Sequence, residues 1–152
     1  MKHCIYILIF FTALLNDDLV AQNRTFISPG IKLGYAFGSN GGLIAGLEVS
    51  YTKFPDNRGL ITGVCLSIEQ LHYSTLFIHV AFEAASIIGA SIGPTLMISK
   101  EHNAFGVAGT VFGGLVILPY YRYTYLPNDL DFGEAGSFLK FPIQLSGSDF
   151  TE

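Results

Sequence analysis

Residues 43–52 read LIAGLEVSYT, and their side chains alternate in character from one residue to the next. One parity holds Leu43, Ala45, Leu47, Val49 and Tyr51, and the other holds Gly46, Glu48, Ser50 and Thr52. A period of two predicts a β-strand, because successive side chains of a strand point to opposite faces. This stretch therefore predicts a strand with one apolar face and one small or polar face.

The same alternation recurs along the chain, and turn-forming residues separate the repeats. Pro94 falls inside one predicted strand, where it costs a ladder hydrogen bond unless a bulge accommodates it. Connections are predicted near 39–42, 55–59, 72–75, 86–89, 101–104 and 127–132. The other alternating segments lie at 29–38, 60–69, 76–83, 91–99, 105–116, 120–125 and 136–143. The pattern predicts about eight antiparallel strands in an all-β chain.

The N-terminus has the pattern of an export signal. Lys2 precedes the apolar run Cys4–Leu15, and the small residue Ala21 follows a short polar stretch. Twelve helical residues span about 18 Å, which is short of a bilayer core of about 30 Å. We therefore predict a signal peptide over 1–21, cleavage after Ala21, and a single domain over 22–152.

The composition fits a chain with a non-aqueous environment. Of the 152 residues, 50% are hydrophobic and only 13% are charged, whereas a soluble domain has about 25% charged residues. The formal net charge of -4 gives no basic field for phosphates, so nucleic-acid binding is not expected.

The second strand face decides between a soluble and a membrane barrel. It combines glycines with charges of both signs, which suit the inside of a narrow eight-stranded barrel better than a soluble surface. We predict that an interior charge network is formed by Lys32, Glu48, Glu69, His79, Glu83, Arg122 and Lys140. The apolar face would then meet lipid, in an antiparallel up-and-down membrane β-barrel.

The export signal, the strand pattern and the length resemble the small outer-membrane β-barrel proteins of Gram-negative bacteria. The last strand adds a motif, since Glu134, Gly136, Leu139 and Phe141 are similar to the signal that the barrel-assembly machinery reads. The resemblance implies an outer-membrane location, contact with outer-membrane lipid and passage through that machinery. The chain departs from the family by continuing over Pro142–Glu152, which leaves open whether this strand closes the barrel.

Three functions remain open from the sequence. The first is a non-enzymatic structural or adhesive role in the envelope. The second is a soluble periplasmic or secreted, lipocalin-like barrel whose apolar faces, with Leu47, Val64, Val80 and Leu96, surround an apolar ligand. The third is a lipid-modifying enzyme with a site at the barrel rim, built from His72, Tyr73, Ser74, Glu101 and His102.

No metal or cofactor is predicted. His79 and Glu83 share a strand face, but positions i and i+4 lie about 13 Å apart along a strand, too far to share one ion. Cys65 is predicted to be a small buried residue, because Cys behaves as a small hydrophobe in most interiors.

Overall fold

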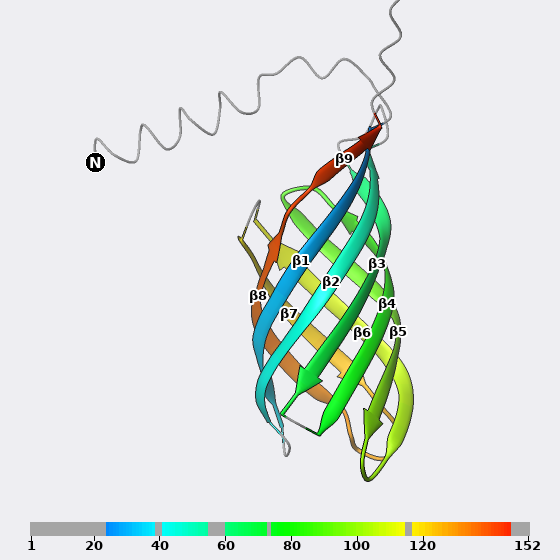
Figure 1. Ribbon diagram of the computed structural model, residues 1–152. Coiled ribbons are helices and arrows are strands. Elements are labelled where there is room, and N and C mark those ends of the chain that lie inside the picture. Colours follow the sequence, from blue (N-terminus) through cyan, green and yellow to red (C-terminus); the bar gives the residue numbers. More distant parts are fainter. Residues whose placement is uncertain (1–23, 39–40, 55–59, 73, 115–116, 147–152) are drawn as a thin grey trace, which may run out of the picture.

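The computed structural model describes residues 24–38, 41–54, 60–72, 74–114 and 117–146 (Figure 1). The predicted signal peptide and its cleavage point lie outside these residues. Within the described ranges, no helix is both long enough and apolar enough to cross a membrane.

The described residues form nine β-strands. In chain order they are β1 (Arg24–Phe37), β2 (Gly42–Phe54), β3 (Ile61–Leu71), β4 (Thr75–Ala85), β5 (Ile88–Ser99), β6 (Asn103–Gly113), β7 (Ile117–Tyr125), β8 (Phe132–Lys140) and β9 (Ile143–Ser146).

The first eight strands close into an up-and-down antiparallel barrel. Each strand from β1 to β7 pairs with the next one along the chain, and β8 pairs with β1. Ile31 of β1, for example, faces Leu47 of β2 on one side and Leu139 of β8 on the other. The predicted fold class is therefore confirmed, and the last long strand does close the barrel.

The two ends of the barrel are formed by different parts of the chain (Figure 1). The β1–β2, β3–β4, β5–β6 and β7–β8 connections share one end, which we call the loop end. The start of β1 and the short strand β9 lie at the opposite end, which we call the terminal end.

The alternation in the sequence becomes an inside and an outside. Leu33, Leu47 and Phe105 lie on the outer surface, each more than 60% exposed. The intervening positions point inward, and among them Lys32 and Glu134 are fully buried. The barrel therefore has an apolar exterior and a polar interior.

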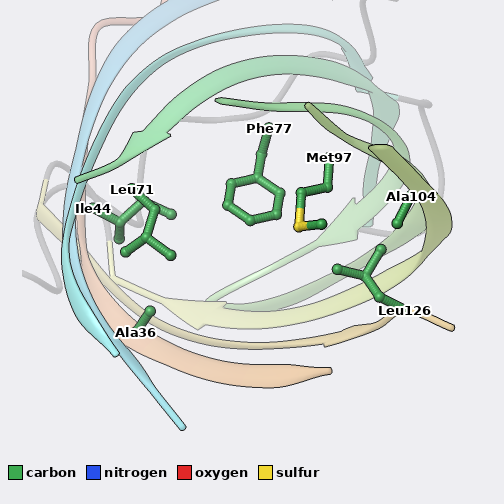
Figure 2. Packing of buried hydrophobic residues seen from close by; sticks show 7 residues of the cluster. All are labelled: Ala36, Ile44, Leu71, Phe77, Met97, Ala104 and Leu126. Carbon is green, nitrogen blue, oxygen red and sulfur yellow. The ribbon is translucent and has the colours of Figure 1, made fainter. Parts of the chain in front are cut away.

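Apolar side chains fill the interior towards the loop end. Phe77 of β4 and Met97 of β5 point into the ring of strands, as Figure 2 shows. Phe77 also packs against Phe132 of β8, with ring centroids 5.2 Å apart. The buried cluster consists of Ala36, Ile44, Leu71, Phe77, Met97, Ala104 and Leu126.

Pro94 is accommodated without a bulge. The register is the same on both sides of it, since His79 faces Thr95 and Phe82 faces Ile92. The β4–β5 ladder is interrupted instead, and the His79 ring Nδ1 donates to the Pro94 carbonyl oxygen at 3.1 Å. Proline has no amide hydrogen to donate to the ladder, and the His79 imidazole supplies a hydrogen bond to the carbonyl group of the same residue.

Several predicted boundaries need correction, among them the starts of β5 at Ile88, β7 at Ile117 and β8 at Phe132, each three or four residues before the predicted start. β1 starts at Arg24, five residues before the predicted start, and β6 already begins at Asn103, inside the predicted 101–104 turn. The predicted last strand over 136–143 is in fact broken at Pro142, and β9 resumes the pairing with β1, where Ile27 faces Ile143. Because proline has no amide hydrogen, it ends the ladder of β8 at this point.

Candidate functional site

The middle of the barrel interior holds four buried charges, which we call the central cluster: Lys32, Glu69, Arg122 and Glu134. Lys32 Nζ lies 2.5 Å from Glu69 Oε2 and also donates to Glu134 Oε1. Arg122 Nη1 lies 2.6 Å from Glu69 Oε1 and 3.5 Å from Glu134 Oε1. Two cations and two carboxylates from β1, β3, β7 and β8 therefore compensate one another inside the barrel.

Neutral side chains add hydrogen bonds to the central cluster, although Glu134 Oε2 has no hydrogen-bond partner among the described residues. Ser67 Oγ donates to Glu69 Oε1 at 2.8 Å, and Arg122 Nε donates to Thr110 Oγ1 at 2.9 Å. Lys32 Nζ also lies 4.7 Å from the centre of the Tyr120 ring, within range of a cation–π interaction. Buried charges are tolerated only when they are paired and hydrogen-bonded in this way.

A second group of charges, the terminal cluster, consists of Glu48, Glu83 and Lys140. Lys140 Nζ lies 2.6 Å from Glu48 Oε1 and 3.4 Å from Glu83 Oε2. It also donates to Ser50 Oγ at 2.9 Å. This cluster has two carboxylates for one cation.

The structure places all seven residues of the predicted charge network in the barrel interior, and six of them belong to the two clusters. His79 belongs to neither by an ion pair, since its Nδ1 hydrogen-bonds to Pro94. Glu134 was missed as an interior charge, because the sequence analysis placed it in the assembly motif. Its parity is that of Gly136 and Phe138, both predicted on the second face, so the signal was present.

Glycines make room for the interior side chains beside the barrel seam. Tyr120 of β7 faces Gly136 of β8, which in turn faces Gly34 of β1. A Cβ on Gly34 would collide with the Tyr120 hydroxyl and lie 2.9 Å from the Ala135 carbonyl oxygen. Gly136 therefore has a steric role at the seam, whatever its role in the predicted assembly motif.

Cys65 is a free cysteine, and its side chain is buried, in agreement with the prediction of a small buried residue. Its sulfur and the carboxylate oxygens of Glu48 and Glu83 lie within 4.8 Å of one another, a spacing that could suit a metal ion. Lys140, however, already bonds both carboxylates with its ammonium group. The donor set is therefore better matched to the lysine than to a divalent cation.

Among the rim residues that the structure describes, no serine is hydrogen-bonded to a histidine base. His72, Ser74 and Glu101 line a hollow of about 530 Å³ at the loop end, and His102 lines a neighbouring one. Within the described ranges, no hydrogen bond joins Ser74 to His72 or His102. Tyr73 lies outside the described residues. A catalytic serine needs a base within hydrogen-bonding reach.

The faces of the strands decide between the two barrel classes. Leu47, Val64, Val80 and Leu96 all lie on the outside, with exposed fractions of 37% to 66%. The alternative of a soluble barrel with these residues around an internal ligand is therefore wrong. An apolar exterior, a polar interior and a closed ladder define a transmembrane β-barrel.

No protein-family model and no curated protein matches the sequence. Among solved structures, the chain is similar to Neisserial surface protein A (NspA), with 11% identity, a TM-score of 0.45, and coverage of 76% of this chain and 95% of that one. It is similar to the Yersinia pestis outer membrane protein Ail, with 11% identity, a TM-score of 0.42, and coverage of 78% and 99%. A designed transmembrane β-barrel gives 10% identity, a TM-score of 0.42, and coverage of 77% and 95%.

Proposed function

We propose that the protein is an integral outer-membrane barrel with a non-enzymatic structural or adhesive role in the cell envelope. The observation that carries the proposal is the inverted arrangement of the faces, with large apolar side chains outside and paired charges inside. The strands β1 to β8 have 9 to 14 residues each, which is enough for a tilted strand to cross a bilayer, since that takes about 9–11 residues.

The filled interior argues against a general porin role. The central cluster draws one side chain from each of β1, β3, β7 and β8, and apolar side chains pack on its loop side. An eight-stranded barrel has an interior that side chains fill, whereas porins need about 16–18 strands to leave a channel.

The loop end offers little surface for a large partner. Its connections are formed by residues 38–41, 72–74, 100–102 and 126–131. Short connections suit a barrel whose contacts are made mainly by its lipid-facing outer surface and by the residues at its rim. The partners in this proposal are outer-membrane lipid and, during biogenesis, the barrel-assembly machinery that reads Glu134, Gly136, Leu139 and Phe141.

The proposal is tested in cells that lack the protein, by measuring detergent sensitivity, surface adhesion and envelope lipid composition. We expect a defect in sensitivity or adhesion, an unchanged lipid composition, and full rescue by a triple variant with His72→Ala, Ser74→Ala and His102→Ala. A changed lipid composition that the wild-type protein restores and the triple variant does not would overturn the non-enzymatic role.

A further inference from the structure

A cavity of about 280 Å³ opens at the terminal end of the barrel. Its volume is close to the lower limit of small-molecule sites, which is roughly 300 Å³. Apolar side chains dominate its lining, including Phe26, Phe54, Ile61, Ile87, Phe112 and Leu118. Glu83 and Lys140 of the terminal cluster also line it, together with Ser28 and Ser50.

The terminal cluster leaves one negative charge at this cavity. Lys140 is closer to Glu48, at 2.6 Å, than to Glu83, at 3.4 Å. Glu83 is the carboxylate that lines the cavity, and it is 5% exposed. The central cluster is balanced by its own two cations, so it supplies no surplus positive charge. A buried carboxylate with incomplete compensation favours a cation beside it.

The aromatic lining also favours a cation. Lys140 Nζ already lies 5.5 Å from the centre of the Phe112 ring, within range of a cation–π interaction. An anion in the cavity would meet the carboxylate of Glu83, and Lys140 is already bonded to two carboxylates. A neutral apolar molecule would bury its surface against the apolar lining, but it would leave the charge of Glu83 without further compensation.

From these observations we infer that the cavity binds a small amphiphilic cation, an alkylammonium or arylammonium ion. The ammonium group bonds Glu83, and the hydrocarbon part lies against the apolar side chains around Phe26 and Phe112. The inference concerns the terminal end of the barrel and is independent of the proposed envelope role.

The test compares three ligands with the same six-carbon chain, namely hexylammonium, 1-hexanol and hexanoate. The full-length chain is folded into zwitterionic lipid nanodiscs, and binding is measured by calorimetry against empty nanodiscs to subtract partition into lipid. We expect hexylammonium to bind at least about tenfold more tightly than 1-hexanol, because it adds a charge-assisted hydrogen bond. Hexanoate should bind more weakly than either.

Variants locate the site. Glu83→Gln should weaken hexylammonium binding by about tenfold and leave 1-hexanol binding within about twofold of wild type. Glu101→Gln is the matched control, since it removes the same charge from an exposed position at the loop end and should change nothing. Heat-dependent gel mobility shows whether each variant has folded.

Two results would overturn the inference. One is equal or weaker binding of hexylammonium relative to 1-hexanol by the wild-type protein, which includes the absence of any binding. The other is unchanged hexylammonium binding by a folded Glu83→Gln variant. The comparison of ligands uses the wild-type protein alone, so it decides the question even if Glu83→Gln does not fold.

Discussion

Lys32 needs charged partners inside the barrel, because its fully buried ammonium group has no contact with water. Its two carboxylate partners come from β3 and β8, on opposite sides of β1 in the closed barrel. The Lys32–Glu69 ion pair therefore connects two strands, β1 and β3, that do not pair directly through the backbone. At the residue scale, the stability of the barrel depends on keeping both charges of each pair.

Replacing Lys32 with Met should lower the free energy of unfolding by about 3–5 kcal/mol, because it leaves two buried carboxylates with only Arg122. Adding Glu134→Gln to this variant should restore at least about 1 kcal/mol, since the second change removes one of the uncompensated charges. Urea unfolding in lipid vesicles measures both values. Lys100→Met, at an exposed position, is the matched control. A Lys32→Met variant as stable as this control would contradict the account.

Two glycines, one inside the barrel and one on its outer surface, allow the tightness of packing at the two places to be compared. Gly34→Ala should cost about 1–3 kcal/mol, because its new methyl group meets the Tyr120 hydroxyl and a neighbouring backbone oxygen. Gly109→Ala makes the same change on the outer surface, where a Cβ contacts nothing within 4 Å, and should stay within about 0.5 kcal/mol of wild type. Equal effects of the two substitutions in urea unfolding would argue against a tightly packed interior.

Parity predicted the face of the seven residues in the predicted charge network but not their partners. The sequence shows that Lys32, Glu69 and Arg122 point the same way, because each lies on the polar parity of its strand. Which of them meet depends on the stagger of the strands around the barrel, and a one-strand pattern contains no information on stagger. The division into central and terminal clusters therefore required the structure.

At the scale of elements, the β1–β8 seam determines whether the sheet becomes a barrel. Gly34 and Gly136 face each other across it, and a Cβ on Gly136 would collide with the Leu33 carbonyl oxygen. Past Lys140 the chain bends at Pro142, and β9 extends the seam along the first residues of β1. The alternating pattern predicted a strand in the region of β8. It did not predict the break between β8 and β9, because the only sign of that break in the sequence is the single residue Pro142.

Gly136→Ala separates the steric role of this glycine from the predicted reading of the motif by the assembly machinery. We expect the variant to fold poorly into pure lipid vesicles, where no machinery is present, because the seam cannot close to its normal spacing. Phe141→Ala, at an exposed position of the same motif, should fold there like the wild type. The fraction with the mobility of the folded barrel on an unheated gel measures both. Normal folding of Gly136→Ala would exclude the steric role.

At the scale of the whole molecule, the barrel has a lipid-compatible surface around a filled interior. The outer surface carries Tyr35, Tyr51, Tyr121 and Tyr125, and aromatic residues form girdles at the two interfaces of transmembrane barrels. Tyrosine has a high propensity for strands of every kind, so a tyrosine girdle at the membrane interface remains a prediction. The inverted faces themselves were predictable, because small residues and mixed charges recur on one parity through the chain.

A filled interior predicts that the purified protein gives no steady conductance in planar lipid bilayers. The central cluster and the apolar cluster on its loop side occupy the barrel interior, which eight strands leave too narrow for an open channel. A 16-stranded porin in the same bilayer is the positive control. A stable, ohmic conductance proportional to the amount of protein would contradict the filled barrel.

Fractionation of cells that express the full-length protein tests the central claim most directly, when it is followed by gel electrophoresis with and without boiling. The account predicts that the protein stays with outer-membrane vesicles and that boiling shifts its mobility, because a closed barrel resists detergent until it is heated. Recovery in the soluble periplasm, with the same mobility before and after boiling, would contradict a barrel whose apolar face meets lipid.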